Sequence, residues 1–188
     1  MNTGILFLII SVIWVASEII LARLKRSGSS DPAQDKHSLR ILWITIAIGV
    51  NLGIIIGFWG KGFIREGSFT ISVTGLAFII IGLIVRWISI ISLRRFFTVD
   101  INIAHDHRLV TKGIYRIIRH PAYSGSLLSF LGLGMVFSSW ISVAVIFIPI
   151  LLAFLYRIRV EENALIAHFG DEYVRYSSLT RRLIPWVY

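Results

Sequence analysis

Hydrophobic residues form long runs along the chain, separated by short polar and basic segments. Apolar runs cover about residues 5–21, 41–59 and 71–93, and a longer stretch extends over residues 123–156. About 20 mostly apolar residues cross the hydrocarbon core as a helix, so each of the first three runs can span once. The fourth is too long for one crossing, and residues 138–140 (Ser-Ser-Trp) divide it into a tight helical hairpin. The pattern predicts an all-α integral membrane protein with five transmembrane helices, in which spans four and five form the hairpin.

A weaker periodic pattern follows the last span, over residues 161 to about 178. Leu165, Phe169 and Tyr173 recur at helical spacing on one face. Gly170-Asp171 is typical of a point where one helix ends and the next is capped. We therefore expect a C-terminal amphipathic helix on the cytoplasmic face of the membrane. Residues 27–38 have the composition of a flexible linker.

Composition agrees with this pattern. Apolar residues make up 56% of the 188 residues and charged residues only 15%, whereas soluble domains have about a quarter charged residues. The length suits one domain, with three N-terminal spans in residues 1–93 and a second half over residues 94–188. The net charge of +9 lies next to the apolar spans, which favours contact with anionic lipid headgroups over nucleic-acid binding. The absence of cysteine excludes disulfides and a cysteine nucleophile.

The basic residues also predict an orientation. They gather in residues 23–40, in residues 94–121 and in the tail after residue 157, while the alternate connections hold only Lys61 and Arg65. Loops rich in lysine and arginine stay in the cytoplasm. With five spans, the N-terminus then lies outside, and the loop of residues 94–121 and the C-terminus face the cytoplasm.

Candidate chemistry flanks the predicted hairpin. Pro121 disfavours helical geometry at His120 and can begin the fourth span as its first-turn proline. Tyr123 follows in the first turn. Arg157 and Glu161, four residues apart at the end of the fifth span, share a helix face. Because the hairpin returns this pair to the same membrane face, the sequence predicts one polar pocket at the cytoplasmic interface, open sideways to lipid.

Each of these features has a plain structural alternative. Arginine and tyrosine near a span end are also typical interfacial anchors, and an isolated Arg157–Glu161 pair is often a surface ion pair. Arg86 in the third span and Glu18 in the first are costly in lipid, and a functional role, a structural pairing or a lining of the lipid-side entrance all remain open for them. Only the joint presence of the flanking motifs, in this order around a hairpin, favours a site.

The order of these motifs resembles one known family. Leu-Val-x-x-Gly-x-Tyr at 109–115, Arg-His-Pro-x-Tyr at 119–123, Arg157 with Glu161-Glu162, and Phe-Gly-x-x-Tyr at 169–173 together resemble the isoprenylcysteine carboxyl methyltransferase family and its prokaryotic relatives. The resemblance covers roughly residues 94–185. It implies a membrane methyltransferase that binds S-adenosylmethionine in a cytoplasm-facing pocket formed by a loop and helices, without a Rossmann domain.

The resemblance also implies roles for individual residues. Arg157 resembles the arginine that receives the acceptor carboxylate, and Glu161 resembles the acid that binds the cofactor; these two are the catalytic candidates. Asp100 lies near a further cofactor-contact position. The implied cofactor-binding residues are His107, Arg108, Leu109, Val110, Gly113, Tyr115, His120, Pro121, Ala122, Tyr123, Glu161 and Glu162.

The expected acceptor is lipophilic or lipidated, carries a carboxylate and enters from the bilayer between helices. Three other functions stay open from the residues: a phospholipid or small-thiol methyltransferase of similar fold, a non-catalytic membrane scaffold, and a lipid reductase that uses NADPH. We do not expect a metal site, because the local cluster of His105, Asp106 and His107 has no distant third ligand at a clear spacing.

Overall fold

The computed structural model of the protein describes residues 3–24, 35–99, 108–185 and 187–188. These residues are mainly helical; they contain two isolated β-bridges and no strand. The predicted all-α fold is therefore confirmed. The helices are α1 Thr3–Leu24, α2 Asp35–Phe58, α3 Ser68–Leu93, α4 Pro121–Val136, α5 Trp140–Phe169 and α6 Asp171–Leu179, with short 3-10 turns η1 Arg94–Phe96 and η2 Gly113–Arg116.

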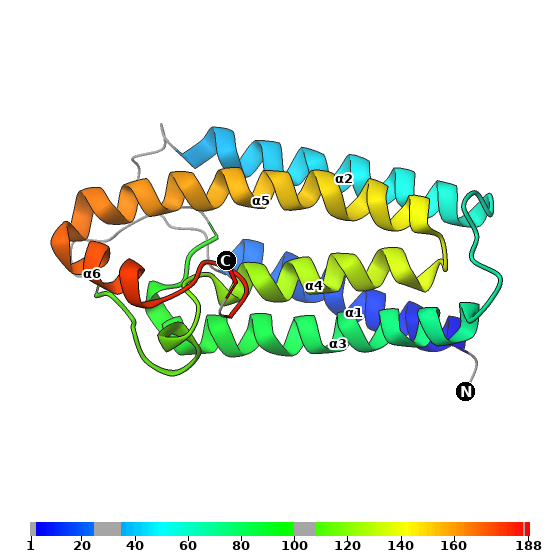
Figure 1. Ribbon diagram of the computed structural model, residues 1–188, viewed down its shortest axis with the longest axis horizontal. Helices are drawn as coiled ribbons and strands as arrows, with labels where there is room; N and C mark the ends of the chain where they lie inside the picture. Colours follow the sequence, from blue (N-terminus) through cyan, green and yellow to red (C-terminus); the bar gives the residue numbers. More distant parts are fainter. Residues whose placement is uncertain (1–2, 25–34, 100–107, 186) are drawn as a thin grey trace.

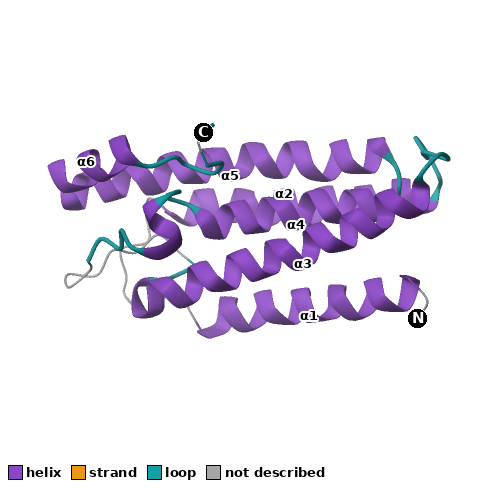
Figure 2. Cartoon of the chain, turned by 60° about the horizontal axis from the view of Figure 1, so that its bottom comes forward, coloured by secondary structure: helices purple, strands orange, loops and turns teal. Residues whose placement is uncertain are grey.

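The five long helices form an elongated bundle. α2 packs along α5, and α3 packs along α4, which also contacts α5 (Figure 1). α1 lies at the edge of the bundle next to α3 (Figure 2). The connections α2–α3 and α4–α5 lie at one end, whereas α6 and the segment around residues 108–120 lie at the other (Figure 1). The chemistry-bearing segments are thus gathered at one end of the bundle.

Three of these helices are long and apolar enough to cross a membrane. Their apolar ranges are His37–Phe58, Ser68–Phe96 and Trp140–Phe169. α1 and α4 contain shorter apolar stretches, Ile5–Leu21 and Pro121–Val136. Many large hydrophobic side chains on the outside of the bundle are exposed, as expected where lipid rather than water surrounds the helices.

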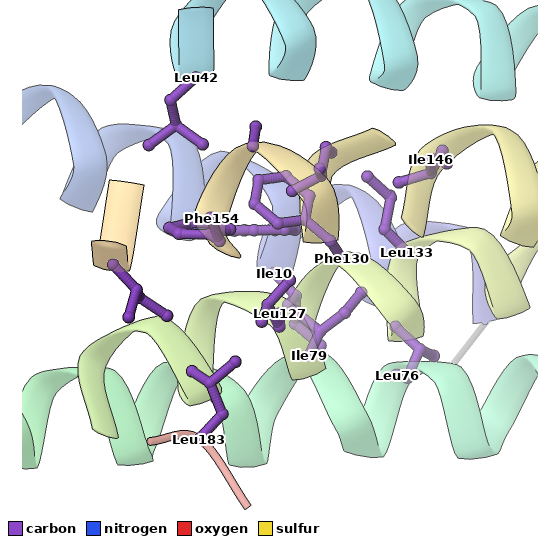
Figure 3. Packing of buried hydrophobic residues seen from close by; sticks show 14 residues of the cluster. Ile10, Leu42, Leu76, Ile79, Leu127, Phe130, Leu133, Ile146, Phe154 and Leu183 are labelled. Atoms are coloured by element: carbon purple, nitrogen blue, oxygen red, sulfur yellow. The ribbon is translucent and has the colours of Figure 1, made fainter. Parts of the chain in front are cut away.

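The core runs along the middle of the bundle. Ile79 of α3 and Ile146 and Ile150 of α5 are fully buried, and Figure 3 shows Ile79 and Ile146 among the side chains that α1, α2, α3, α4 and α5 contribute. α3 and α4 approach closely because both carry glycines at the contact. A Cβ added at Gly125 would lie 2.5 Å from the carbonyl oxygen of Gly82. Small residues at such crossings are typical of membrane helix pairs.

The predicted hairpin break is also confirmed. α4 ends at Val136 and α5 begins at Trp140. The side chain of Ser139 caps α5 by accepting a hydrogen bond from the Ser142 N–H at 3.2 Å. The Ser138 hydroxyl binds the Ser68 carbonyl at 2.8 Å, which fixes the turn against the start of α3.

Two predicted boundaries were wrong. Residues 161–169 are not a separate surface helix, because α5 continues through them to Phe169. Gly170, with φ of 53°, ends α5 as predicted, but Asp171 is the first residue of α6 and makes no capping bond with its side chain. The predicted linker over residues 27–38 is too long, since α2 already begins at Asp35. In both places the helix extends beyond the apolar run because backbone hydrogen bonds do not require apolar side chains.

Candidate functional site

The start of α4 has the geometry that the Arg-His-Pro motif predicts. Pro121 is the first helical residue, and His120 before it is non-helical, with φ of −121° and ψ of 55°. The backbone of this segment pairs with the C-terminal tail. The N–H groups of Arg119 and His120 donate to the carbonyls of Arg181 and Arg182 at 2.7 and 3.0 Å. The tail therefore holds the backbone of Arg119 and His120 in place.

The hairpin brings α5 back to this point. The Tyr123 hydroxyl donates to Glu161 Oε2 at 2.6 Å, and His120 Nδ1 lies 3.8 Å from Glu161 Oε1. The rings of His120 and Tyr123 are stacked, with centroids 5.6 Å apart. The predicted convergence of the two distant segments is confirmed, because side chains 38 residues or more apart share one cluster.

Arg157 lies one helical turn before Glu161 and is almost fully buried, with 2% of the residue exposed. Its guanidinium donates from Nε to the Tyr123 hydroxyl at 3.1 Å, from Nη1 to the Ser38 hydroxyl at 3.1 Å and from Nη2 to the Val99 carbonyl at 2.7 Å. One arginine thus joins α2, the segment after η1 and α4 to α5. Arg157, Tyr123 and Glu161 form a continuous hydrogen-bonded chain.

A cavity of about 600 Å³ opens beside this chain. Its polar end includes Tyr115, His120, Tyr123, Arg157 and Glu161. The cavity continues between α1 and α2 as an apolar groove, which we define by Phe7, Trp14, Leu42, Ile46, Ile54, Phe130 and Leu133. The cavity is therefore amphiphilic along its length.

The structure gathers most of the residues predicted from the sequence. Those that line the cavity are Leu109, Val110, Tyr115, His120, Ala122, Tyr123, Arg157 and Glu161. Arg108 is exposed beside η1 and does not line it. Gly113 is exposed, and Pro121 is buried at the first position of α4. His107 and Asp100 lie outside the described residues.

Glu162 lies on a different side of α5 from Glu161 and does not line the cavity. Its carboxylate accepts bonds from Arg119 Nε at 3.0 Å and Arg182 Nε at 2.9 Å, and it lies 3.4 Å from His120 Nε2. Only 8% of the side chain is exposed. Glu162 therefore links the tail and the start of α4 to α5. Loss of Arg119 or Arg182 would leave part of the Glu162 charge buried without its counter-charge.

The cavity also includes residues that were not among the predicted site residues. Tyr173 and Tyr176 of α6 line it, as does Arg119. The Tyr176 hydroxyl donates to the Tyr115 carbonyl at 2.7 Å, and burial raises the pKa of Tyr176 to about 12, so it is a neutral donor at physiological pH. Tyr173 belongs to the Phe-Gly-x-x-Tyr motif, and this motif is the sequence signal that could have identified it as a site residue. No sequence signal identified Ser38, the partner of Arg157.

Known proteins of one family are similar to this chain. Residues 75–167 match the sequence model of the Isoprenylcysteine carboxyl methyltransferase (ICMT) family. Protein-S-isoprenylcysteine O-methyltransferase B of Arabidopsis thaliana is 39% identical over 119 residues, which cover 62% of this chain and 60% of the plant protein. The matched part thus spans less than two thirds of that relative. Protein-S-isoprenylcysteine O-methyltransferase of Schizosaccharomyces pombe is 27% identical over 99% of this chain and 84% of the yeast protein.

A solved structure shows the same relationship. The structure of the eukaryotic intramembrane Ras methyltransferase ICMT matches with a TM-score of 0.58 and 25% sequence identity, over 73% of this chain and 52% of that chain. The family match includes Arg157 and the motif of residues 119–123, which form the polar end of the cavity. The chain is thus similar to the isoprenylcysteine carboxyl methyltransferase family both in sequence and in fold.

Proposed function

We propose that the protein is a membrane methyltransferase that transfers the methyl group of S-adenosylmethionine to the carboxylate of an isoprenylcysteine-like or other lipophilic acceptor. The observation that carries this proposal is the amphiphilic cavity, in which Arg157, Tyr123 and Glu161 stand at the polar end of a long apolar groove. Its shape suits a polar cofactor and an acceptor that is polar at one end only.

The polar end has the groups that S-adenosylmethionine requires. The Glu161 carboxylate can pair with a cationic amine or sulfonium, and the faces of Tyr115 and Tyr123 can stabilise a cation by about 0.5–2 kcal/mol. Tyr173 also lines the cavity and adds a further aromatic side chain to its polar end. A cavity of about 600 Å³ lies within the range of ordinary cofactor sites.

The reaction requires alignment more than acid–base chemistry. Bound S-adenosylmethionine would supply an electrophilic methyl carbon on a sulfonium. The acceptor oxygen would bond to this carbon as the carbon–sulfur bond breaks, with a neutral thioether as leaving group and no proton transferred. The role of the chain is then to orient the acceptor and exclude water, which can lower a barrier by roughly 7–11 kcal/mol in favourable cases.

Arg157 is the residue that would hold the acceptor carboxylate. Its Nη1 and Nη2 now donate to the neutral oxygens of Ser38 and Val99. A carboxylate that replaces these oxygens would form charge-assisted bonds, which are roughly twice as strong. Tyr123, bonded to both Arg157 and Glu161, connects the acceptor side of the site with the cofactor side.

The apolar groove between α1 and α2, which we call the acceptor groove from here on, would take the hydrocarbon part of the acceptor. On α2 the cavity lining extends from Leu39 to Ile54, 15 residues that correspond to roughly 22 Å along a helix. This length exceeds what a small polar metabolite requires. Since the groove lies between α1 and α2, a lipid chain could enter it from the bilayer.

We also propose that all five long helices cross the membrane, with the N-terminus outside and the polar end of the cavity, α6 and the C-terminus in the cytoplasm. The placement of α6 and the segment around residues 108–120 at one end supports this orientation (Figure 1), as does the excess of lysine and arginine in these segments.

Thermal unfolding of the purified protein with each of two ligands tests the cofactor. S-adenosylhomocysteine should raise the unfolding temperature, and NADP should not, because a ligand that binds only the folded state stabilises it. Stabilisation by NADP alone would favour a lipid reductase, and stabilisation by neither would favour a scaffold.

Transfer of a labelled methyl group then identifies the acceptor. We expect label in an N-acetylated S-prenylcysteine, in a form that mild base releases as methanol, because the product is a carboxyl ester. Label in a phospholipid amine or a small thiol instead would contradict the carboxylate assignment.

A further inference from the structure

Glu18 of α1 and Arg86 of α3 are two charged residues that the proposed reaction does not use. They form a two-pronged ion pair: Arg86 Nε lies 2.6 Å from Glu18 Oε1, and Nη2 lies 2.7 Å from Oε2. Nη1 donates to the Ser126 hydroxyl of α4 at 2.8 Å. Only 12% of the Arg86 side chain and 22% of the Glu18 side chain are exposed.

This pair lies in the wall of the cavity. Arg86 Nη1 is also 3.5 Å from the carbonyl of Ala122, in the first turn of α4 next to Tyr123. Toward the other end of α1, the cavity wall continues with Trp14, Ser11 and Phe7. The pair therefore stands between the polar end of the cavity and the acceptor groove, where the head of an amphiphilic acceptor meets its chain.

α1 has few other directional contacts with the bundle. The rings of Trp14 and Phe130 lie 5.0 Å apart and those of Phe7 and Phe137 lie 6.1 Å apart, but aromatic contacts tolerate sliding and rotation. A planar guanidinium that holds both oxygens of one carboxylate fixes distance and orientation together. Because an unpaired charge in an apolar environment is costly, the pair also strongly favours one position of α1.

We propose that Glu18 and Arg86 are positioning residues that hold α1 as the side wall of the acceptor groove and thereby determine how tightly the lipophilic acceptor binds. This inference rests on the proposed function, since that function assigns the groove to the acceptor. The pairing also neutralises Arg86.

The position of α1 can be measured without any activity. The chain has no cysteine, so Ile20→Cys with Ile44→Cys places two spin labels on the outward sides of α1 and α2, where these residues are 50% and 47% exposed. In lipid nanodiscs, Glu18→Gln should broaden or shift the distance distribution between the labels. Ser17→Ala, which removes a hydroxyl that donates to the Trp14 carbonyl of the same helix, should leave it unchanged. An identical distribution in Glu18→Gln and the parent would overturn the inference.

Kinetics separate positioning from general damage. Glu18→Gln should raise KM for an N-acetylated S-prenylcysteine about tenfold, equivalent to loss of one decade of affinity, and should change kcat by less than about twofold. Affinity for S-adenosylhomocysteine in calorimetry should not change. A fall in kcat or in cofactor affinity, with KM unchanged, would contradict the assignment.

A double-mutant cycle tests whether the residues act as a pair. The effects on KM of Glu18→Gln and Arg86→Gln should be clearly less than additive in the double variant, because each single change already breaks the same contact. Additive effects would show that the residues act separately and would overturn the pairing. If the parent protein binds no S-adenosylhomocysteine and methylates no acceptor, the proposed function fails, and the label distances still decide whether the pair positions α1.

Discussion

Tyr123 is the residue through which the charged groups of the site act on one another. Its hydroxyl accepts from Arg157 Nε at 3.1 Å and donates to Glu161 Oε2 at 2.6 Å, while its ring stacks on His120. A phenol is suited to this place because it can donate and accept at once. The ring and the hydroxyl therefore make separate contributions that a single substitution can distinguish.

Tyr123→Phe keeps the ring and removes only the hydroxyl. Hydrogen bonds to charged groups contribute about 1.5–3 kcal/mol, so we expect kcat to fall about 10–100-fold at 1.36 kcal/mol per decade. Single-turnover methyl transfer with saturating cofactor measures the effect. The matched control is Tyr156→Phe, because Tyr156 is the exposed neighbour of Arg157 on α5. Equal turnover in Tyr123→Phe and the parent would show that the hydroxyl is not part of the reaction site.

At this scale the sequence predicts neighbours along one helix better than neighbours across the fold. The four-residue spacing placed Arg157 and Glu161 on one face, and Pro121 set the backbone of His120, because both effects are local. The family resemblance implies that Glu162 binds the cofactor. In the structure its carboxylate contacts Arg182, and such a contact depends on where the tail passes. Local spacing contains no information about that path.

At the scale of elements, the contact of α3 with α4 sets the position of the site. Gly125 faces Gly82 and Arg86 across this contact, and an added Cβ would lie 2.5 Å from the Gly82 carbonyl oxygen and 2.7 Å from the Arg86 nitrogen. Both neighbours are backbone atoms, which cannot turn away as a side chain can. α4 would have to shift, and with it His120 and Tyr123 at its start.

Gly125→Ala should therefore reduce stability by about 1–3 kcal/mol, the usual cost of overpacking a close contact. It should also weaken binding of S-adenosylhomocysteine, because the first turn of α4 moves with the helix. Thermal unfolding in detergent and calorimetry measure the two effects. Thr74→Ala provides the comparison, since Thr74 is partly exposed on α3 and its hydroxyl donates to the Thr70 carbonyl of the same helix. A variant as stable as the parent would mean that α3 and α4 can separate at little cost.

Among the elements, the hairpin was predictable and the length of α5 was not. A run of 34 residues, 123–156, exceeds one membrane crossing, and Ser138-Ser139 offered a break with capping hydroxyls. The end of α5 was misplaced because Arg157, Arg159 and Glu161 ended the apolar run. The helix continues because the buried side chains of Arg157, Ile158 and Glu162 pack on the tail and on α2. Hydropathy marks where a helix leaves an apolar environment, not where its backbone ends.

For the whole molecule, the number of membrane crossings between two segments decides whether they lie on the same side of the membrane. An odd number places the site and the α2–α3 connection on opposite sides. α6 and the segment around residues 108–120 lie at the end of the bundle opposite the α2–α3 and α4–α5 connections (Figure 1). If the long helices all cross, residues at these two ends must face different compartments. The net charge of +9 comes mainly from segments at the end that holds α6, which the positive-inside rule assigns to the cytoplasm.

Labelling of single cysteines from each side tests this arrangement directly, because the parent chain contains no cysteine. Glu66→Cys lies in the α2–α3 connection and Ser178→Cys lies in α6, and both positions are exposed. In intact cells a membrane-impermeant maleimide should label Glu66→Cys and spare Ser178→Cys, and in inverted vesicles the pattern should reverse. Labelling of both from the same side would mean that an even number of spans separates them. In that case either α3 or one helix of the hairpin does not cross, and the proposed arrangement of five crossings is wrong.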